Sequence, residues 1–126
     1  MVGRAYLRSS RLNDTTIEMV VTGHPTADDL ISFMNSTFPN TPFRDVLWDL
    51  TQASLAMLDI SEFQTIEDVA SQYSAARGPD LKTAILLSSA TDLLLVRAYT
   101  AMTLDLRPSA IRASTNRQEL LDWLAA

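Results

Sequence analysis

The sequence predicts an α/β fold: a single mixed, mostly parallel five-stranded sheet in the order ββαβαβαβα, with an antiparallel opening hairpin and four helices. Short apolar, β-branched runs alternate with longer segments of helical period. At four places a Ser, Thr or Asn stands three positions before an acid or a glutamine, which is typical of a helix start. Gly and Pro separate these segments. Strands joined through helices imply right-handed crossovers and parallel pairing.

The chain is one domain, residues 1–126, because its 126 residues with 47% hydrophobic side chains suffice for one core. No apolar run approaches the roughly 18–20 residues that span a bilayer, so membrane contact is at most peripheral. Residues 1–12 lack the apolar segment of a signal peptide, and we expect a cytoplasmic protein.

Composition excludes several chemistries. The absence of cysteine excludes disulfides, thiolate catalysis and iron–sulfur clusters, and the formal net charge of −5 argues against nucleic-acid binding. Three glycines, without a Walker A or Gly-x-Gly-x-x-Gly motif, leave no phosphate-binding loop. His24 is the only histidine and lies in a turn before Pro25. We therefore expect no catalytic residue, no metal and no cofactor.

The hairpin is predicted from the strands Arg4–Arg11 and Thr15–Val21 on either side of Asn13-Asp14. Thr26 and Asp29 then form a capping box. The helix that follows ends at Pro39 and has its apolar side chains on one face: Leu30, Phe33, Met34, Thr37 and Phe38.

A short buried strand, Val46–Trp48, is expected to end at Asp49. Ligands of open α/β sheets bind where such strands end, so Asp49 is a candidate ligand residue. Asp59 and Asp92 stand near other strand ends and helix starts. The three carboxylates form either an acidic site or a set of turn and cap residues.

The second helix is predicted to begin with Ser61 as its N-cap and Gln64 three residues later, and to close at Gly78-Pro79. Its inner residues are Phe63, Ile66, Ala70 and Tyr73. Leu81–Leu87 follows as a central strand. The last strand is Pro108–Ala113, and Asn116 with Glu119 caps a terminal helix.

Two segments carry more apolar residues than a sheet needs. Residues 53–58 are apolar within an expected loop, and Met57 and Leu58 should be partly exposed as a lid. The helix from about Ala90 to Asp105, capped by Ser89 and Asp92, is apolar around most of its circumference.

One stripe of that helix suits the sheet: Leu95, Ala98, Tyr99, Met102 and Leu106. The neighbouring stripe is a candidate interface between two copies of the chain: Leu94, Arg97, Ala101 and Leu104. We therefore expect a homodimer.

The element order, the VLWDLT segment at 46–51, the TADDL segment at 26–30 and the RQELLDWL segment at 117–124 resemble the SpoIIAA-like proteins of the STAS superfamily. These are relatives of bacterial anti-sigma-factor antagonists and are often described alongside CRAL-TRIO lipid carriers. The resemblance extends over nearly the whole chain, including a strand with Arg112 before the final Trp123-Leu124.

The resemblance implies a phospho-acceptor. In the antagonists, an Asp-Leu-Ser strand leads to Asp-Ser-Ser-Gly, whose second serine is phosphorylated. Here Asp49-Leu50-Thr51 matches the strand, and Asp59–Glu62 lies where the second motif belongs, so that Ser61 falls on the phospho-acceptor position. Ile60 and Glu62 depart from the pattern, and the connecting segment is longer.

The sequence thus supports a non-enzymatic binding or interaction module of SpoIIAA-like fold, regulatory through a protein partner or as a homodimer. The alternative is a protein that binds an apolar small molecule or a lipid, with the lid near 53–58 and the third helix. A small hydrolase or isomerase using Asp49 is a third reading.

Overall fold

The computed structural model describes residues 5–56, 58–73, 81–103 and 111–126. In chain order the elements are β1 (Tyr6–Arg11), β2 (Thr16–Gly23), α1 (Ala27–Thr37), a 3-10 turn (Phe38–Asn40), β3 (Asp45–Ala53), α2 (Ile60–Gln72), β4 (Thr83–Leu86), α4 (Ala90–Thr103), β5 (Ile111–Ser114) and α5 (Arg117–Ala125).

The sheet confirms the predicted class. Its order is β1-β2-β3-β4-β5, with β1 antiparallel to β2 and all the other pairs parallel. The hairpin forms around Asn13, whose side-chain oxygen accepts the backbone N–H groups of Thr15 and Thr16 at 2.9 and 3.0 Å. The strand predicted at Leu81–Leu87 forms over the shorter range Thr83–Leu86 and is an inner strand, paired with β3 on one side and β5 on the other.

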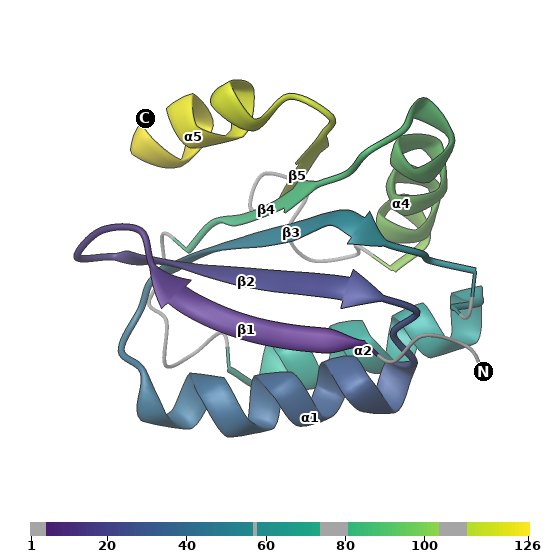
Figure 1. Ribbon diagram of the computed structural model, residues 1–126, viewed down its shortest axis with the longest axis horizontal. Helices are drawn as coiled ribbons and strands as arrows, with labels where there is room; N and C mark the ends of the chain where they lie inside the picture. The colour runs from purple at the N-terminus through teal and green to yellow at the C-terminus, as the bar shows by residue number, and fades with distance from the viewer. Residues whose placement is uncertain (1–4, 57, 74–80, 104–110) are drawn as a thin grey trace.

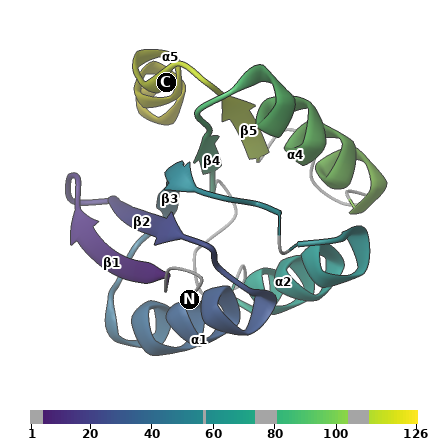
Figure 2. The same ribbon diagram turned by 45° about the vertical axis from the view of Figure 1, so that its right-hand side comes forward.

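The strand order decides which face each helix covers. Successive strands are added in one direction, so right-handed crossovers place α1, α2 and α4 on the same face (Figures 1 and 2). After β5 the chain turns back, and α5 packs on the opposite face against β4 and β5.

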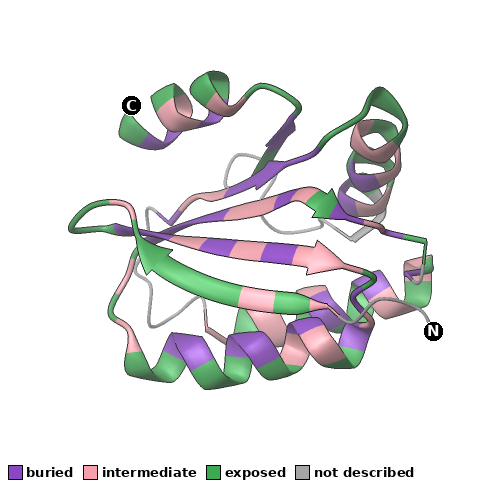
Figure 3. Ribbon diagram, viewed as in Figure 1, coloured by how far each residue is buried: buried purple, intermediate pink, exposed green. Residues whose placement is uncertain are grey.

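Each face has its own core. On the three-helix face, Ile17, Met19 and Val46 of the sheet pack in one cluster with residues of α1, α2 and α4. On the other face, Leu47, Leu86 and Ala84 pack against Leu120 and Leu124 of α5. In Figure 3 buried and less buried residues alternate along β2, as expected of a strand whose two faces differ in cover.

The predicted helix starts largely hold. Thr26 and Asp29 form the capping box, with the Asp29 N–H donating to Thr26 Oγ1 at 3.2 Å and the Thr26 N–H donating to Asp29 Oδ2 at 2.9 Å. The predicted inner face of α1 is buried. In α2, Phe63 and Ile66 are buried, and Ala70 and Tyr73 are half-buried.

The end of the third strand and the start of the second helix were predicted wrongly. β3 continues past Asp49 to Ala53, so Asp49 lies inside the strand and not at its end. The register of β2 against β3 shifts between Val20 and Thr22, because β3 has one extra residue between Asp49 and Gln52. α2 begins at Ile60 with Asp59 as its N-cap, so Ser61 is not the cap.

The buried stripe of α4 also differs from the prediction. Val96 and Thr100 are buried, whereas Ala98, expected to face the sheet, is exposed. α4 packs against both α2 and β5, and these two neighbours together set its rotation. A helix that is apolar around most of its circumference does not select one stripe by itself.

The second helix also ends earlier than predicted: α2 stops at Gln72, with Tyr73 as its C-cap, and does not reach the predicted end at Gly78-Pro79. Gly78-Pro79, Leu106 and the predicted start of the last strand at Pro108 lie outside the described ranges. Among the described residues, no helix has both the length and the apolar character to cross a membrane.

Candidate interaction site at the carboxyl edge of the sheet

Four of the described helices begin at the edge where the parallel strands end. Each start is capped by a side-chain oxygen that accepts a backbone N–H: Asp29 to Thr26 at 3.2 Å, Glu62 to Asp59 at 2.8 Å, Asp92 to Ser89 at 3.1 Å and Glu119 to Asn116 at 3.2 Å. The caps leave fewer first-turn N–H groups for an external anion. Asp59 therefore caps α2, and Asp92 stands in the first turn of α4, where Ser89 is the cap.

Ser61 lies in the first turn of α2, two residues after the cap, and is exposed. Asp59 caps the helix, so the Ser61 hydroxyl is not needed there. Among the described residues it makes no hydrogen bond, while the Ser61 carbonyl accepts from the Thr65 hydroxyl at 3.1 Å. The hydroxyl is thus accessible at the position that the family pattern assigned to it.

The large apolar residues that the structure describes in the loop before α2 are not exposed as a lid would require. Leu55 and Leu58 are buried in the core, which contradicts the expected exposure of Leu58. The loop is tied down by the Ser54 N–H donating to the Gly23 carbonyl at 2.7 Å and the Tyr99 hydroxyl donating to the Leu58 carbonyl at 3.4 Å. Met57 lies outside the described residues.

The Asp49 carboxylate contacts Thr51 on its own strand and Arg117 of α5. Its Oδ1 accepts the Thr51 N–H at 3.0 Å and the Thr51 hydroxyl at 2.6 Å, next to the register shift. Its Oδ2 lies 3.8 Å from Nη1 of Arg117. The same Arg117 nitrogen lies 2.7 Å from Oε2 of Glu18 on β2, in an ion pair that does not have hydrogen-bond geometry. Arg117 therefore links the first turn of α5 to two strands.

Sequence reasoning missed this link. Glu18 is a single acid between apolar strand residues, a pattern that fits any partly covered sheet face. Arg117 was one of several arginines late in the chain, with nothing to single it out. The only sequence signal was the position of Glu18 in a strand, where an acid is uncommon.

The outer face of α4 carries three of the predicted interface residues. Leu94 is 67% exposed, and Arg97 and Ala101 are also exposed. The Arg97 guanidinium donates to the Ala113 carbonyl of β5 at 3.4 Å, so it holds α4 to the sheet as well. Leu104 lies outside the described residues.

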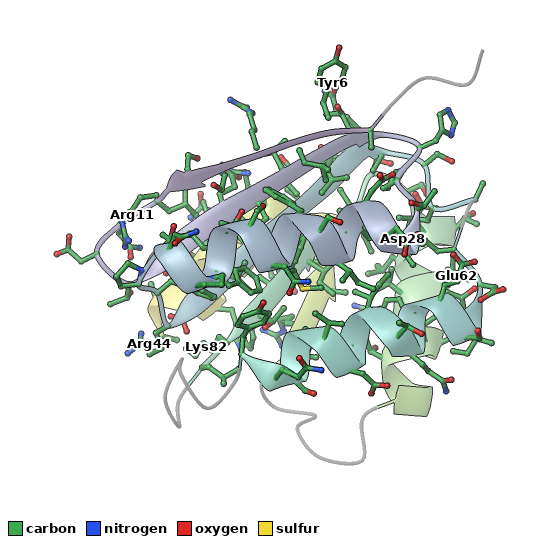
Figure 4. All side chains as sticks on the ribbon, turned by 90° about the horizontal axis from the view of Figure 1, so that it is seen from below. Tyr6, Arg11, Asp28, Arg44, Glu62 and Lys82 are labelled. Carbon is green, nitrogen blue, oxygen red and sulfur yellow. The ribbon has the colours of Figure 1, made fainter. Side chains whose placement is uncertain are left out.

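Charge is distributed unevenly between the two ends of the molecule. Figure 4 shows Asp28 and Glu62 at one end of the helical layer and Arg11, Arg44 and Lys82 at the other. The acids belong to helix first turns, where they complement the helix dipole. A partner of the carboxyl edge would therefore meet negative charge.

At the opposite edge, Phe38, Phe43 and Tyr73 line an open depression of about 300 Å³. Their rings pack on one another, with centroids 4.7 Å apart for Phe38 and Phe43 and 5.2 Å apart for Phe38 and Tyr73. In the described ranges, no group of three or more His, Cys, Asp or Glu side chains is placed to hold a metal ion.

No family model matches the chain, and no curated protein is similar to it at a significant level. Solved structures are similar over nearly the whole length. A DUF3478-family protein with a SpoIIAA-like fold from Shewanella loihica PV-4 aligns with TM-score 0.54 and 18% identity, covering 95% of this chain and 93% of that one.

Two further similar structures are of SpoIIAA. The unphosphorylated anti-sigma-factor antagonist aligns with TM-score 0.62 and 13% identity, covering 95% of this chain and 96% of its own. The phosphorylated Bacillus cell-fate determinant aligns with TM-score 0.60 and 13% identity, covering 94% and 99%. The chain therefore has a SpoIIAA-like fold.

Proposed function

We propose that this protein is a non-enzymatic interaction module that regulates a protein partner through the carboxyl edge of its sheet, with Ser61 as a phospho-acceptor. The observation that carries the proposal is the exposed Ser61 hydroxyl in the first turn of α2, released from capping by Asp59. Similarity to an anti-sigma-factor antagonist solved in unphosphorylated and phosphorylated forms supports it.

The charges around Ser61 indicate how a phosphate would act. A phosphate there would carry roughly −1.5 to −2 charges at neutral pH beside a helix N-terminus, which favours it, and beside Glu62, which does not. We therefore expect phosphorylation to change the affinity for a partner more than the stability of the fold. A partner with basic residues facing this edge would gain or lose affinity as Ser61 is modified.

The experiment is affinity capture from cells of the source organism with wild-type protein, followed by titration calorimetry of the purified partner. We expect one defined partner, bound with similar affinity by wild type and Ser61→Ala. Ser61→Asp should change the affinity about tenfold, which is the scale of a few well-placed charge interactions. The matched control is Thr65→Asp, an exposed threonine one turn later in α2.

Equal effects of Ser61→Asp and Thr65→Asp would contradict the site, because a general charge effect would then suffice. A failure to recover any partner, together with no phosphate on Ser61 in protein isolated from its own cells, would contradict the proposed function.

We also propose that the protein forms a homodimer through the outer face of α4. The exposed Leu94 supports this together with Ala98 and Ala101, which are also exposed on α4, because covering them with a second copy would remove apolar area from water. Apolar-ligand binding is less favoured, because Leu58, one of the two residues expected to form the lid, is buried. Native mass spectrometry separates the two: a dimer mass favours the interaction module, and a copurified acyl chain favours the carrier.

A further inference from the structure

We propose that the outer edge of β1 binds an extended acidic peptide, which would add to the sheet as a sixth strand. This surface lies on a different part of the molecule from the first turn of α2, and the proposal does not rest on the function proposed for Ser61. It follows from the direction of the backbone groups of β1, from the charge of that strand and from the cover of its two faces.

The hairpin register shows which backbone groups point outward. The Leu12 N–H donates to the Thr16 carbonyl at 2.9 Å, so Leu12 and Thr16 form a hydrogen-bonded antiparallel pair. Such pairs alternate along a ladder. Within β1, Tyr6, Arg8 and Ser10 therefore direct their N–H and C=O groups to β2, and Leu7, Ser9 and Arg11 direct theirs to the free edge.

The opposite side of β2 agrees with this assignment. The Thr15 carbonyl accepts from the Asp45 N–H at the start of β3 at 3.0 Å, so odd-numbered residues of this strand segment direct their backbone groups toward β3. The even-numbered ones remain for β1. Both ladders therefore indicate that the backbone groups of Leu7, Ser9 and Arg11 point away from β2.

No residue that the structure describes pairs with the outer edge of β1, which is the first strand in the sheet order (Figure 1). The strand has six residues and contains no proline, glycine or acid. Nothing within it interrupts its backbone, as a proline or a bulge would in a protected edge strand. Such an edge accepts an added strand by main-chain hydrogen bonds.

The charge of β1 indicates which kind of strand its outer edge binds. β1 carries Arg8 and Arg11 in a chain whose formal net charge is −5. In a two-fold antiparallel pairing of two β1 strands, the central registers set the two Arg8 side chains opposite or diagonal to each other, which is destabilising. An acidic peptide meets opposite charge in the same place. We therefore assign the edge to a peptide and not to a second copy.

The two faces of β1 define the peptide further. Tyr6, Arg8 and Ser10 are exposed on the face that α5 covers only farther along the sheet, and the side chain of Tyr6 projects away from the helices in Figure 4. Leu7 points to the other face and packs against the helical core. Because side chains of a strand alternate, the matching peptide alternates acidic residues with apolar ones.

The test uses a fluorescein-labelled, end-capped seven-residue peptide of alternating Glu and Val, titrated with the full chain and followed by anisotropy. Amide hydrogen exchange by NMR locates the binding. We expect saturable binding, with new protection at the Ser9 and Arg11 amides. The Arg8 and Ser10 amides should be protected already in the free protein. Absence of saturable binding, or protection elsewhere only, would overturn the proposal.

Variants distinguish the contribution of main-chain hydrogen bonds from the contribution of charge. Ser9→Pro removes one outward N–H and should weaken binding about fivefold to tenfold, as expected for one lost hydrogen bond, whereas Ser9→Ala keeps that N–H and should bind normally. Arg8→Glu should also weaken binding, while Arg112→Glu, the same charge change on the far edge strand β5, should not. If Ser9→Pro does not fold, Arg8→Glu and the exchange pattern decide.

Two further results bear on the occupant. Ser61→Asp should leave peptide binding unchanged, so the peptide surface and the α2 site can fail separately. A dimer that forms without peptide and protects the Ser9 and Arg11 amides would overturn the assignment to a peptide.

Discussion

The carboxylate of Asp45 at the start of β3 accepts the backbone N–H of Lys82, 37 residues later in the chain, at 2.9 Å. The same carboxylate receives the Arg44 guanidinium at 3.0 Å, and its side chain is completely buried. One side chain thereby aligns the beginnings of β3 and β4. Neither residue stands out in the sequence, where Asp45 was not singled out at all.

Asp45→Ala should destabilise the protein by about 2 kcal/mol, because the Lys82 backbone N–H and the partly exposed Arg44 guanidinium lose their charged acceptor together. Asp45→Asn keeps an oxygen for the Lys82 N–H and should recover part of this loss. Urea unfolding measures both. A cost within about 0.5 kcal/mol for Asp45→Ala, the range of ordinary surface changes, would show that the pair is not structural.

The two candidate caps of α2 give opposite expectations. Asp59→Ala should cost about 1 kcal/mol because the Glu62 N–H loses its acceptor. Ser61→Ala should cost less than about 0.5 kcal/mol, since the hydroxyl lies exposed within the helix. Thermal unfolding of the two variants side by side checks this. The reverse ranking would restore Ser61 as the cap.

Glu67 makes stability depend on pH. Burial, and to a smaller extent the neighbouring Asp68, raises the pKa of the Glu67 carboxyl above 4.5. The folded protein then binds the proton more tightly than the unfolded chain, so this contribution is full below pH 4.5 and is lost as pH rises through the folded pKa.

Glu67→Gln should therefore raise the melting temperature at pH 7 and have little such benefit at acidic pH. Asp68→Asn should give a smaller rise, because burial is the larger cause. Melting curves at both pH values provide the measurement. An effect of Glu67→Gln that does not vary with pH would exclude this explanation.

Leu94→Glu should convert the proposed dimer into a folded monomer with unchanged far-ultraviolet dichroism, because Leu94 is 67% exposed and holds no core position. Light scattering over a range of concentrations measures the mass. Thr65→Glu on α2 adds the same charge elsewhere and should leave the dimer intact. A wild type that is monomeric at tens of micromolar would rule the interface out.

Residues close together in the sequence were enough to predict the kinds of element and their order. The Thr26 and Asp29 box lies within one helical turn, and the apolar spacing of Leu30, Phe33 and Met34 repeats within the same segment. Such signals depend on neighbouring residues alone, so they can be recognised without knowledge of the fold. The cap of α2 was missed because Asp59 and Ser61, two residue types that both favour N-cap positions, stand two positions apart.

Only the tertiary structure decided how distant segments use their side chains. Leu58 is buried because the loop after β3 is held beside Gly23 and Tyr99. Val96, not Ala98, faces inward because α4 packs between two neighbours. The sequence determined that α5 is a helix capped by Asn116. The ion pair between Arg117 and Glu18, at 2.7 Å, forms only because the sheet brings these distant parts of the chain together. No local sequence pattern encodes such a contact.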